Sequence, residues 1–368
     1  MEKLSLQDPR WQPPFCPNHK CRYHQHFQGP WPFKKQGFYR RSLSPRTVQR
    51  FQCKHCKRSF SVQTFSQSYW QKRPDLDRRI FLKICGGMAA RQIARDLEVS
   101  PSTVDRHIER LGRHCLLFHR NLMQNYQLLG DLVIDGFETF ELSQYFPFHH
   151  NLAVEAETGF FLSFTDSELR RKGRMREDQK SRRGELEAQW GRPDPKAVEK
   201  GVRELLEDVL AGASSVVIRS DDHRAYPRAM RGLACNIEHQ VTSSRDYRDR
   251  HNALWEINLL DLLLRHSNAN HRRETLAWSK RRQNSSLRLA ILLVWRNYLK
   301  KRWEKGKRET PAMLKGLCKR PLKREEILTE RLFPKRQKLS PRWEHYYRGS
   351  IHTRALGKNR EHTLSYAY

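Results

Sequence analysis

Four cysteines near the start of the chain have the types and spacing of a metal site. Four residues separate Cys16 from Cys21, and two separate Cys53 from Cys56. Zinc is held by thiolate and imidazole ligands, and a closed structural site uses four of them. The pairs therefore predict a structural zinc ion in a small β-rich module, with four buried thiols as the alternative interpretation. The nearby histidines that could replace a cysteine ligand are His19, His24, His26 and His55.

Two aspartates in the middle of the chain stand where a catalytic metal could bind. Asp135 lies in the apolar run 131–140, and Asp221 follows the apolar run 215–220, so a strand is expected in each place. Carboxylates on neighbouring strands repel each other unless a divalent cation neutralises them. Two Mg²⁺ or Mn²⁺ ions about 4 Å apart activate a nucleophile and stabilise a leaving oxygen in phosphoryl transfer. Both aspartates are therefore predicted to bind such ions.

A third carboxylate completes a site of this kind, and the sequence offers two candidates. Glu274 is preferred, because it stands on a predicted helix whose cations suit contact with a nucleic-acid backbone. Glu256 is the alternative, and Asp222 and Glu138 are acids close to the first two candidates. For any single acid, a solvated surface group or a helix cap is the alternative interpretation. The cations around Glu274 are Arg272, Arg273, Lys280, Arg281 and Arg282.

The segment 88–114 has the pattern of two helices joined by a tight turn. Apolar residues recur at helical spacing before and after the turn, and Ser100 followed by Pro101 is typical of a helix start. The pattern predicts a helix-turn-helix, whose second helix presents polar side chains to bases and phosphates. An ordinary helical hairpin with a charged face is the alternative. The predicted outward positions are Ser102, Thr103, Arg106, His107 and Arg110.

The charge balance favours a nucleic-acid partner. The chain has 368 residues, with 71 lysines and arginines against 40 acidic residues and a formal net charge of +31. So large a charge opposes compaction unless a polyanion neutralises it, and basic side chains displace counterions from phosphates. A basic ribosome-associated or membrane-surface protein is the alternative interpretation.

Other features predict a soluble cytoplasmic protein. The cysteines outside the two pairs are scattered, which favours a reducing compartment. The first eleven residues contain no apolar run, so no secretory signal is expected. The longest apolar stretch, 287–295, contains Arg288 and is too short to span a bilayer, so no membrane partner is expected.

The order of these patterns predicts a multidomain chain. Three strands, a helix, a strand, a helix and a strand predict a mixed α/β sheet of the ribonuclease-H type, interrupted by a charged insertion at 167–196. The basic C-terminal extension is expected to contact DNA or support assembly, with a solvated extension as the alternative. The predicted domains are a zinc ribbon at 1–75, a helix-turn-helix domain at 76–126, the catalytic domain at 127–300 and the extension at 301–368.

On these motifs the chain resembles an insertion-sequence transposase of the DDE class, from a bacterial mobile element. The resemblance covers roughly residues 15 to 300 and rests on the cysteine pairs, the helix-turn-helix, VIDGFETFE, IRSDDHRAYPRAM and HSNANHRRETLAWSKRR. Its Tyr-Pro-x-Ala segment assigns the second catalytic carboxylate to Asp221, and its Asn-rich, Glu-bearing segment assigns the third to Glu274. The gap between these two is longer than many such families show, and Glu256 would fit the shorter spacing.

The resemblance implies transposition of DNA. Metal-bound water would free a 3′ hydroxyl at the element end, and that hydroxyl would attack target DNA without a covalent protein intermediate. The implied partners are terminal repeats, target DNA and further copies of the chain, in a nucleoid-associated setting.

Two other functions remain open. One is a nuclease or resolvase of the same fold, which cuts without joining. The other is a DNA-binding regulator that is not an enzyme. Metal-dependent cleavage separates an enzyme from the regulator, and joining separates a transposase from a nuclease.

Overall fold

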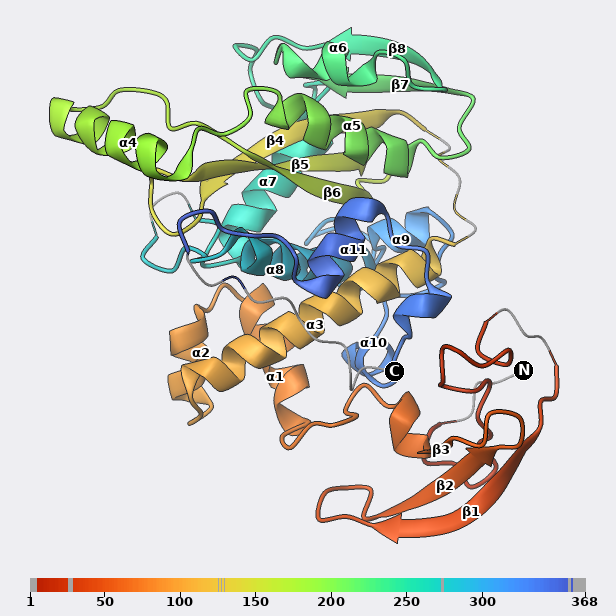
Figure 1. Ribbon diagram of the computed structural model, residues 1–368. Coiled ribbons are helices and arrows are strands. Elements are labelled where there is room, and N and C mark those ends of the chain that lie inside the picture. The colour runs from red at the N-terminus through yellow and green to blue at the C-terminus, as the bar shows by residue number, and fades with distance from the viewer. Residues whose placement is uncertain are drawn as a thin grey trace.

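The computed structural model describes residues 5–25, 29–124, 126, 128, 130–272, 275–356 and 359. Figure 1 shows, from the bottom of the view upward, a small antiparallel sheet, a group of helices and a larger mixed sheet. Within the described part of the chain, no helix combines the length and apolar character needed to cross a membrane.

The small sheet is the β-rich module that the cysteine spacing predicts. Its strands pair in the order β1-β2-β3, all antiparallel. The rings of Phe51, Phe60 and Phe65 are buried together and also pack against Phe333, which comes from the C-terminal stretch. The elements are β1 (Phe33–Arg40), β2 (Thr47–Cys53), β3 (Ser59–Ser61) and the 3₁₀ helix η1 (Val62–Phe65).

Three helices follow, and the last two have the predicted tight turn between them. Ser100 caps the long helix through its Oγ, which accepts a hydrogen bond from the Thr103 amide at 3.2 Å, and Pro101 is the first helical residue. Gly112 permits close contact with a later helix, because a Cβ there would lie 2.6 Å from the Leu287 Cβ. The helices are α1 (Asp75–Cys85), α2 (Ala90–Asp96) and α3 (Pro101–Leu122).

The large sheet has the order β6-β5-β4-β7-β8, so the strands follow the chain order 3-2-1-4-5. The pairs β4·β5 and β5·β6 are antiparallel, whereas β4·β7 and β7·β8 are parallel. Parallel neighbours require crossover connections, and helices supply them here. The strands are β4 (Leu132–Phe140), β5 (Pro147–Glu155), β6 (Phe161–Glu168), β7 (Ser215–Ser220) and β8 (Asn236–Val241).

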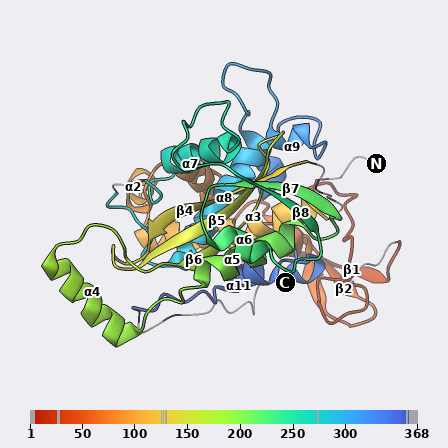
Figure 2. The same ribbon diagram turned by 90° about the horizontal axis from the view of Figure 1, so that it is seen from above.

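Helices cover both faces of this sheet (Figures 1 and 2). Successive strand residues point to opposite faces, and two neighbours on β5 show this. His150 Nε2 lies 2.9 Å from Ser285 Oγ on α8, whereas the Asn151 side chain lies against Gly201 of α5. The covering helices are α5 (Ala197–Val209), α6 (Ala225–Met230), α7 (Trp255–Ser267) and α8 (Arg282–Val294), which continues as the π-helix η2 (Trp295–Leu299).

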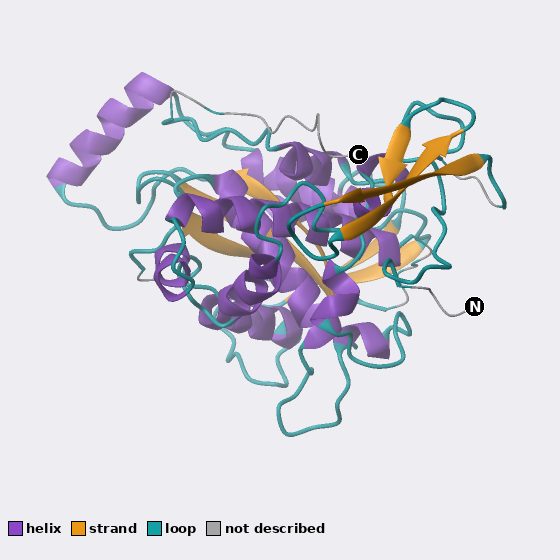
Figure 3. Ribbon diagram, turned by 90° about the horizontal axis from the view of Figure 1, so that it is seen from below, coloured by secondary structure: helices purple, strands orange, loops and turns teal. Residues whose placement is uncertain are grey.

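The charged stretch between β6 and α5 forms the exposed helix α4 (Glu177–Trp190), which contains no buried residue. It projects away from the rest of the chain in Figure 3. The exposure of this helix agrees with the charged insertion that the sequence predicts at 167–196.

The described part of the C-terminal stretch packs against the preceding chain. The Trp343 indole donates to the Phe164 carbonyl of β6 at 2.9 Å, and Glu330 forms a β-bridge with Ser66. Several of its apolar residues, including Ile327, Trp343 and Tyr346, therefore belong to the core, which a solvated extension would not explain. The elements are α9 (Pro311–Leu314), α10 (Arg324–Leu328), the 3₁₀ helix η3 (Pro334–Arg336) and α11 (Pro341–Arg348).

The prediction of a helix around Glu274 is wrong. The described residues on either side of Glu274 are not helical. Asn268 ends α7, residues 269–272 and 275–281 are turns and coil, and α8 begins only at Arg282. The Asn270 amide donates to Asn268 Oδ1 at 3.2 Å, a local bond that competes with helix continuation. Glu274 itself and Arg273 lie outside the described residues.

Arg282, expected from the sequence to lie beside nucleic acid, is buried instead. Its Nε lies 2.9 Å from Asp166 Oδ2, and its Nη2 lies 3.0 Å from Glu168 Oε1. Its backbone amide donates to Glu141 Oε2 at 2.7 Å. Arg282 therefore joins α8 to β6, and the sequence interpretation was wrong for this cation because charge alone does not reveal a buried partner.

We expect Arg282→Met to lower the free energy of unfolding by about 3–5 kcal/mol, because it leaves the buried Asp166 carboxylate without a main partner. Urea unfolding measures the change, with the exposed Lys280→Met as a control that stays near wild type. Burial opposes ionisation of Asp166, but Arg282 and Arg342 outweigh it and hold the pKa of that carboxyl below its ordinary value. The deficit should therefore shrink below about pH 4, where unfolded aspartate is protonated. A deficit that does not change with pH would argue against this pairing.

Candidate metal centres

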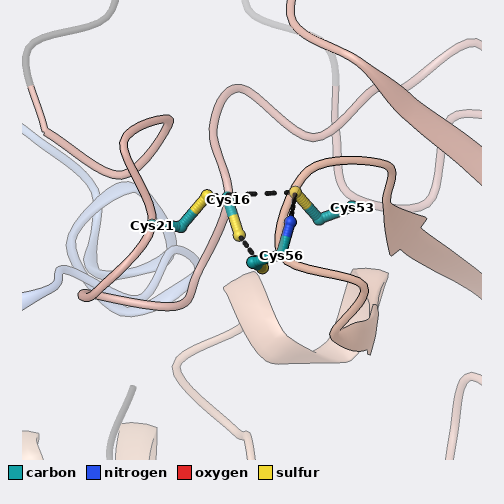
Figure 4. A group of neighbouring side chains, drawn as sticks. All are labelled: Cys16, Cys21, Cys53 and Cys56. Carbon is teal, nitrogen blue, oxygen red and sulfur yellow. Dashed lines mark hydrogen bonds between the residues drawn. The ribbon is translucent and has the colours of Figure 1, made fainter.

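The two cysteine pairs meet in one cluster, as the sequence predicts (Figure 4). The ligand atoms of Cys16, Cys21, Cys53 and Cys56 all lie within 4.8 Å of one another. Cys16 Sγ lies 3.7 Å from Cys56 Sγ, and Cys21 Sγ lies 3.9 Å from Cys53 Sγ.

These separations fit zinc. A disulfide needs sulfur atoms about 2.05 Å apart. Four sulfurs arranged tetrahedrally at about 2.3 Å from a zinc ion are roughly 3.8 Å from one another. Four thiolates leave no open coordination position, so the ion that this cluster could hold would be structural.

The histidines near the cluster have other contacts. His24 Nδ1 is hydrogen-bonded to the Cys16 carbonyl at 2.8 Å, and His55 Nδ1 lies 3.6 Å from Cys21 Sγ. Both histidines therefore lie beside the cluster and are not members of it. His19 is half-buried outside the cluster, and His26 lies outside the described residues.

Asp135 and Asp221 are brought side by side by the parallel pairing of β4 with β7. Leu132 pairs with Ile218 and Val133 with Arg219, and Asp221 follows directly after the end of β7 at Ser220. Adjacent strands lie about 4.8 Å apart. Burial raises the pKa of Asp135 to about 6, the Gly136 amide opposes that rise, and the charge of Asp221 adds to it. The two carboxylates therefore interact, as the sequence predicts for neighbouring strands.

Tyr226 is close to these two acids and to a third one, Asp261. Its buried hydroxyl donates to Asp135, and burial together with Asp135, Asp221 and Asp261 raises its pKa well above the ordinary value. Tyr226 is the tyrosine of the sequence DDHRAYPRAM. This sequence follows β7, and its last six residues form α6. The backbone amide of His223 donates to Asp221 Oδ1 at 3.0 Å and orients that carboxylate.

The position of Asp261 follows from the packing of α7 on β4. The Arg265 guanidinium lies 4.3 Å above the centre of the Phe137 ring. Asp261 is one helical turn before Arg265, and Asp135 is two strand residues before Phe137. These steps are about 6 Å along a helix and about 6.6 Å along a strand, so they match. The half-buried Asp261 thus lies one turn from a residue that packs on β4, and its charge acts on Tyr226.

Three carboxylates of this kind suit Mg²⁺ or Mn²⁺, which prefer oxygen ligands. Among the described residues, their oxygens do not form a group within 4.8 Å of one another, in contrast to the cysteines. Two ions about 4 Å apart need a wider set of ligands than one ion does. The donor chemistry of Asp135, Asp221 and Asp261 suits a divalent cation, while their oxygens are spread more widely than the cysteine sulfurs.

The other acids considered from the sequence have separate surroundings. Glu256 is buried, and its Oε1 pairs with Arg302 Nη2 at 2.6 Å, near the β5–β6 turn. Asp222 is exposed, and its Oδ2 accepts a hydrogen bond from Ser244 Oγ at 3.3 Å. Glu138 is exposed at 4.0 Å from His149 Nε2.

The predicted outward positions of α3 fall into two groups. Ser102 and Arg106 are exposed and Thr103 is half-buried, all on the first two turns of the helix. His107 is buried, with Nδ1 2.6 Å from Asp77 Oδ1, so its predicted outward position was wrong. Arg110 is half-buried, and its Nη2 donates to the Gln67 and Tyr69 carbonyls, each at 2.6 Å.

The described cations between α7 and α8 are spread along the loop. Arg272 is exposed, and its Nη2 would lie 3.0 Å from a Cβ on Gly87, at the turn before α2. The Lys280 ammonium lies 3.7 Å from the centre of the Trp278 ring. Arg281 Nη1 donates to Asn359 Oδ1 at 3.2 Å.

Comparison with known proteins leaves the family open. No protein-family model matches the chain, and no curated protein matches it. Among solved structures, it is similar to a chain of the simian T-cell lymphotropic virus intasome in complex with PP2A regulatory subunit B56 gamma, at 14% identity and a TM-score of 0.23. The match covers 52% of this chain and 56% of that chain, so it spans about half of each. A likeness this distant carries no argument about function.

Proposed function

We propose that the chain is a DNA transposase of the DDE class, which cuts and joins DNA strands with the help of divalent cations. The observation that carries the proposal is the parallel pairing of β4 with β7, which brings Asp135 on β4 close to Asp221 directly after β7. The strand order 3-2-1-4-5, antiparallel and then parallel, supports the ribonuclease-H-like catalytic domain that the sequence predicts.

Asp135 and Asp221 would hold the cations, and we assign the third carboxylate to Asp261 in place of Glu274. Mg²⁺ or Mn²⁺ bound there would supply activation of the attacking oxygen and stabilisation of the leaving oxygen. Tyr226 would orient Asp135 through its hydroxyl, and the His223 amide would orient Asp221.

The proposed reaction has two steps. Water first attacks a phosphodiester at an element end, which leaves a 3′ hydroxyl on the element end and a 5′ phosphate on the flanking piece of the same strand. The 3′ hydroxyl then attacks a phosphorus atom of target DNA, forms a new phosphodiester and releases a 3′ hydroxyl of the target. Joining two ends in one event calls for at least two copies of the chain.

The proposal also assigns a role to each of the other predicted domains. The zinc ribbon at 1–75 and the helix-turn-helix domain at 76–126 would bind element ends in the bacterial cytoplasm, with Ser102, Thr103 and Arg106 facing DNA. The catalytic domain would be 127–300, and the stretch 301–368 would brace the other domains.

The test is strand transfer by the wild type and by Asp221→Asn. Both proteins are incubated with labelled element-end DNA, a target plasmid and Mg²⁺ or Mn²⁺. We expect joined products from the wild type and none from the variant, with equal DNA binding by both. Nicking without joining would favour the nuclease, and metal-independent binding without cleavage would favour the regulator.

A further inference from the structure

A groove of about 550 Å³ lies between the small sheet and the segment 67–71 that leads into α1. We call it the ribbon groove. No acidic residue lines it, although acids make up 40 of the 368 residues of the chain. Its charged and aromatic lining residues include Tyr39, Arg41, Arg50, Arg58, Tyr69 and Trp70. The groove therefore combines positive charge with aromatic rings.

Trp70 is held in an unusual conformation at this groove. Its side chain is 67% exposed, and its φ of 61° lies in the left-handed region that bulky residues rarely adopt. Such backbone strain costs of the order of 1–3 kcal/mol and is concentrated at ligand-binding sites. Burial of the indole does not repay this cost, because most of its surface faces solvent.

The segment that carries Trp70 is fixed from α3. The Arg110 guanidinium donates to the Gln67 and Tyr69 carbonyls, on the N-terminal side of Trp70. On its C-terminal side, Gln71 Nε2 donates to Asp77 Oδ2 at 2.7 Å, and Asp77 is in turn bonded to His107. The backbone that carries the indole is thereby held before any ligand arrives, which lowers the entropic cost of binding.

We propose that the ribbon groove binds an unpaired DNA strand, with a base stacked on Trp70 and phosphates held by the arginines of the groove. Aromatic faces bind bases that are not stacked in a duplex, and arginines in a groove follow the backbone. Charge complementarity supports a polyanion, and the aromatic lining supports exposed bases over a plain acidic peptide. Arg110 and His107 are then positioning residues, which hold the segment from within the protein.

Stacking in the ribbon groove does not depend on catalysis by the aspartates; only the choice of DNA over RNA rests on the proposed function. A chain that fails to join DNA can still bind single strands here. Binding is therefore measured without divalent cations, so that failure of this inference and failure of the proposed function are seen separately.

The experiment uses the full chain and fluorescence anisotropy with labelled dT20, rU20 and a blunt duplex of 20 base pairs. We expect Trp70→Ala to weaken binding of dT20 about tenfold, because stacking contributes that much for a single base. Duplex affinity should change less than about twofold. Trp70→Phe keeps an aromatic face and should restore most of the dT20 affinity.

Trp303→Ala is the matched control, because Trp303 is also exposed, at 45%, and lies outside the groove. Equal zinc content and equal thermal melting of all variants show that the fold is intact. Equal loss with Trp70→Ala and Trp303→Ala would overturn the proposal. So would an equal loss on duplex and single strands, failure of Trp70→Phe to restore binding, or tighter binding of rU20 than of dT20.

Discussion

An Asp261→Asn protein is expected to lose strand cleavage by about a thousandfold relative to wild type. The substitution keeps the size of the side chain but removes the negative charge that would hold a cation. A thousandfold loss corresponds to about 4 kcal/mol of transition-state stabilisation, a magnitude expected when a catalytic cation is displaced. Single-turnover cleavage of labelled element-end DNA measures the rate, and a binding assay on the same DNA should show little change.

Glu274→Gln is the decisive comparison, since sequence resemblance favours Glu274 as the third carboxylate. We expect this variant to cleave at close to the wild-type rate. A large loss with Glu274→Gln and none with Asp261→Asn would return the role to Glu274. Glu256→Gln is expected to act on stability instead, because its partner Arg302 would be left half-buried without a carboxylate.

A metal-binding measurement separates the metal centre from the reaction. Calorimetric titration of DNA-free protein with Mn²⁺ should show weaker binding in Asp135→Asn, Asp221→Asn and Asp261→Asn than in wild type. If the wild type binds Mn²⁺ through these residues but cuts no DNA, the metal centre stands and the transposase assignment fails. Unchanged Mn²⁺ binding in all three variants would show that these aspartates do not form a metal centre.

The sequence predicted the parts of this molecule that depend on local patterns. Paired cysteines, short apolar strands and a Ser-Pro helix start are local features, and all three have the predicted outcome. Asp135 and Asp221 could be paired from sequence because each ends or interrupts an apolar strand. The register of their strands could not be predicted, because it depends on which strands become neighbours in the sheet.

Asp261, which we propose as the third carboxylate, was not singled out from the sequence because its context resembles an ordinary buried helix. It stands in INLLDLLL, where the leucines dominate the pattern and a single acid looks like a surface position. The available signal was that this acid is the only charged residue in that run. Its proposed role depends on where α7 packs on β4, and that packing is a tertiary contact with no local sequence pattern.

His107, Arg110 and Arg282 illustrate the same limit for charged residues. Each was expected outside because its type is usually solvated. His107 instead pairs with Asp77, Arg110 donates to backbone carbonyls, and Arg282 pairs with Asp166. A charge that is shielded from solvent needs a partner, and the partners of all three residues lie 30 or more residues away in sequence, beyond the reach of helical or strand periodicity.

Cys53→Ser is expected to unfold the zinc module while the large sheet stays folded. Structural zinc contributes about 10–16 kcal/mol of apparent binding free energy in small zinc domains, more than so few apolar side chains can supply. Bound zinc measured by mass spectrometry should fall from one ion per chain towards none. Proteolysis should then cut between β1 and β2, and the single-strand affinity assigned to the ribbon groove should be lost.

Cys235→Ser provides the matched control, since Cys235 is half-buried at the start of β8 and lies outside the cluster. This variant should keep its zinc and its resistance to protease. Because Phe333 packs against the ring cluster of the module, loss of zinc should also expose the C-terminal stretch to protease near that residue. A folded module in Cys53→Ser, with no zinc bound by the variant or by the wild type, would mean that the cysteines are ordinary buried thiols and that the aromatic cluster alone holds this sheet together.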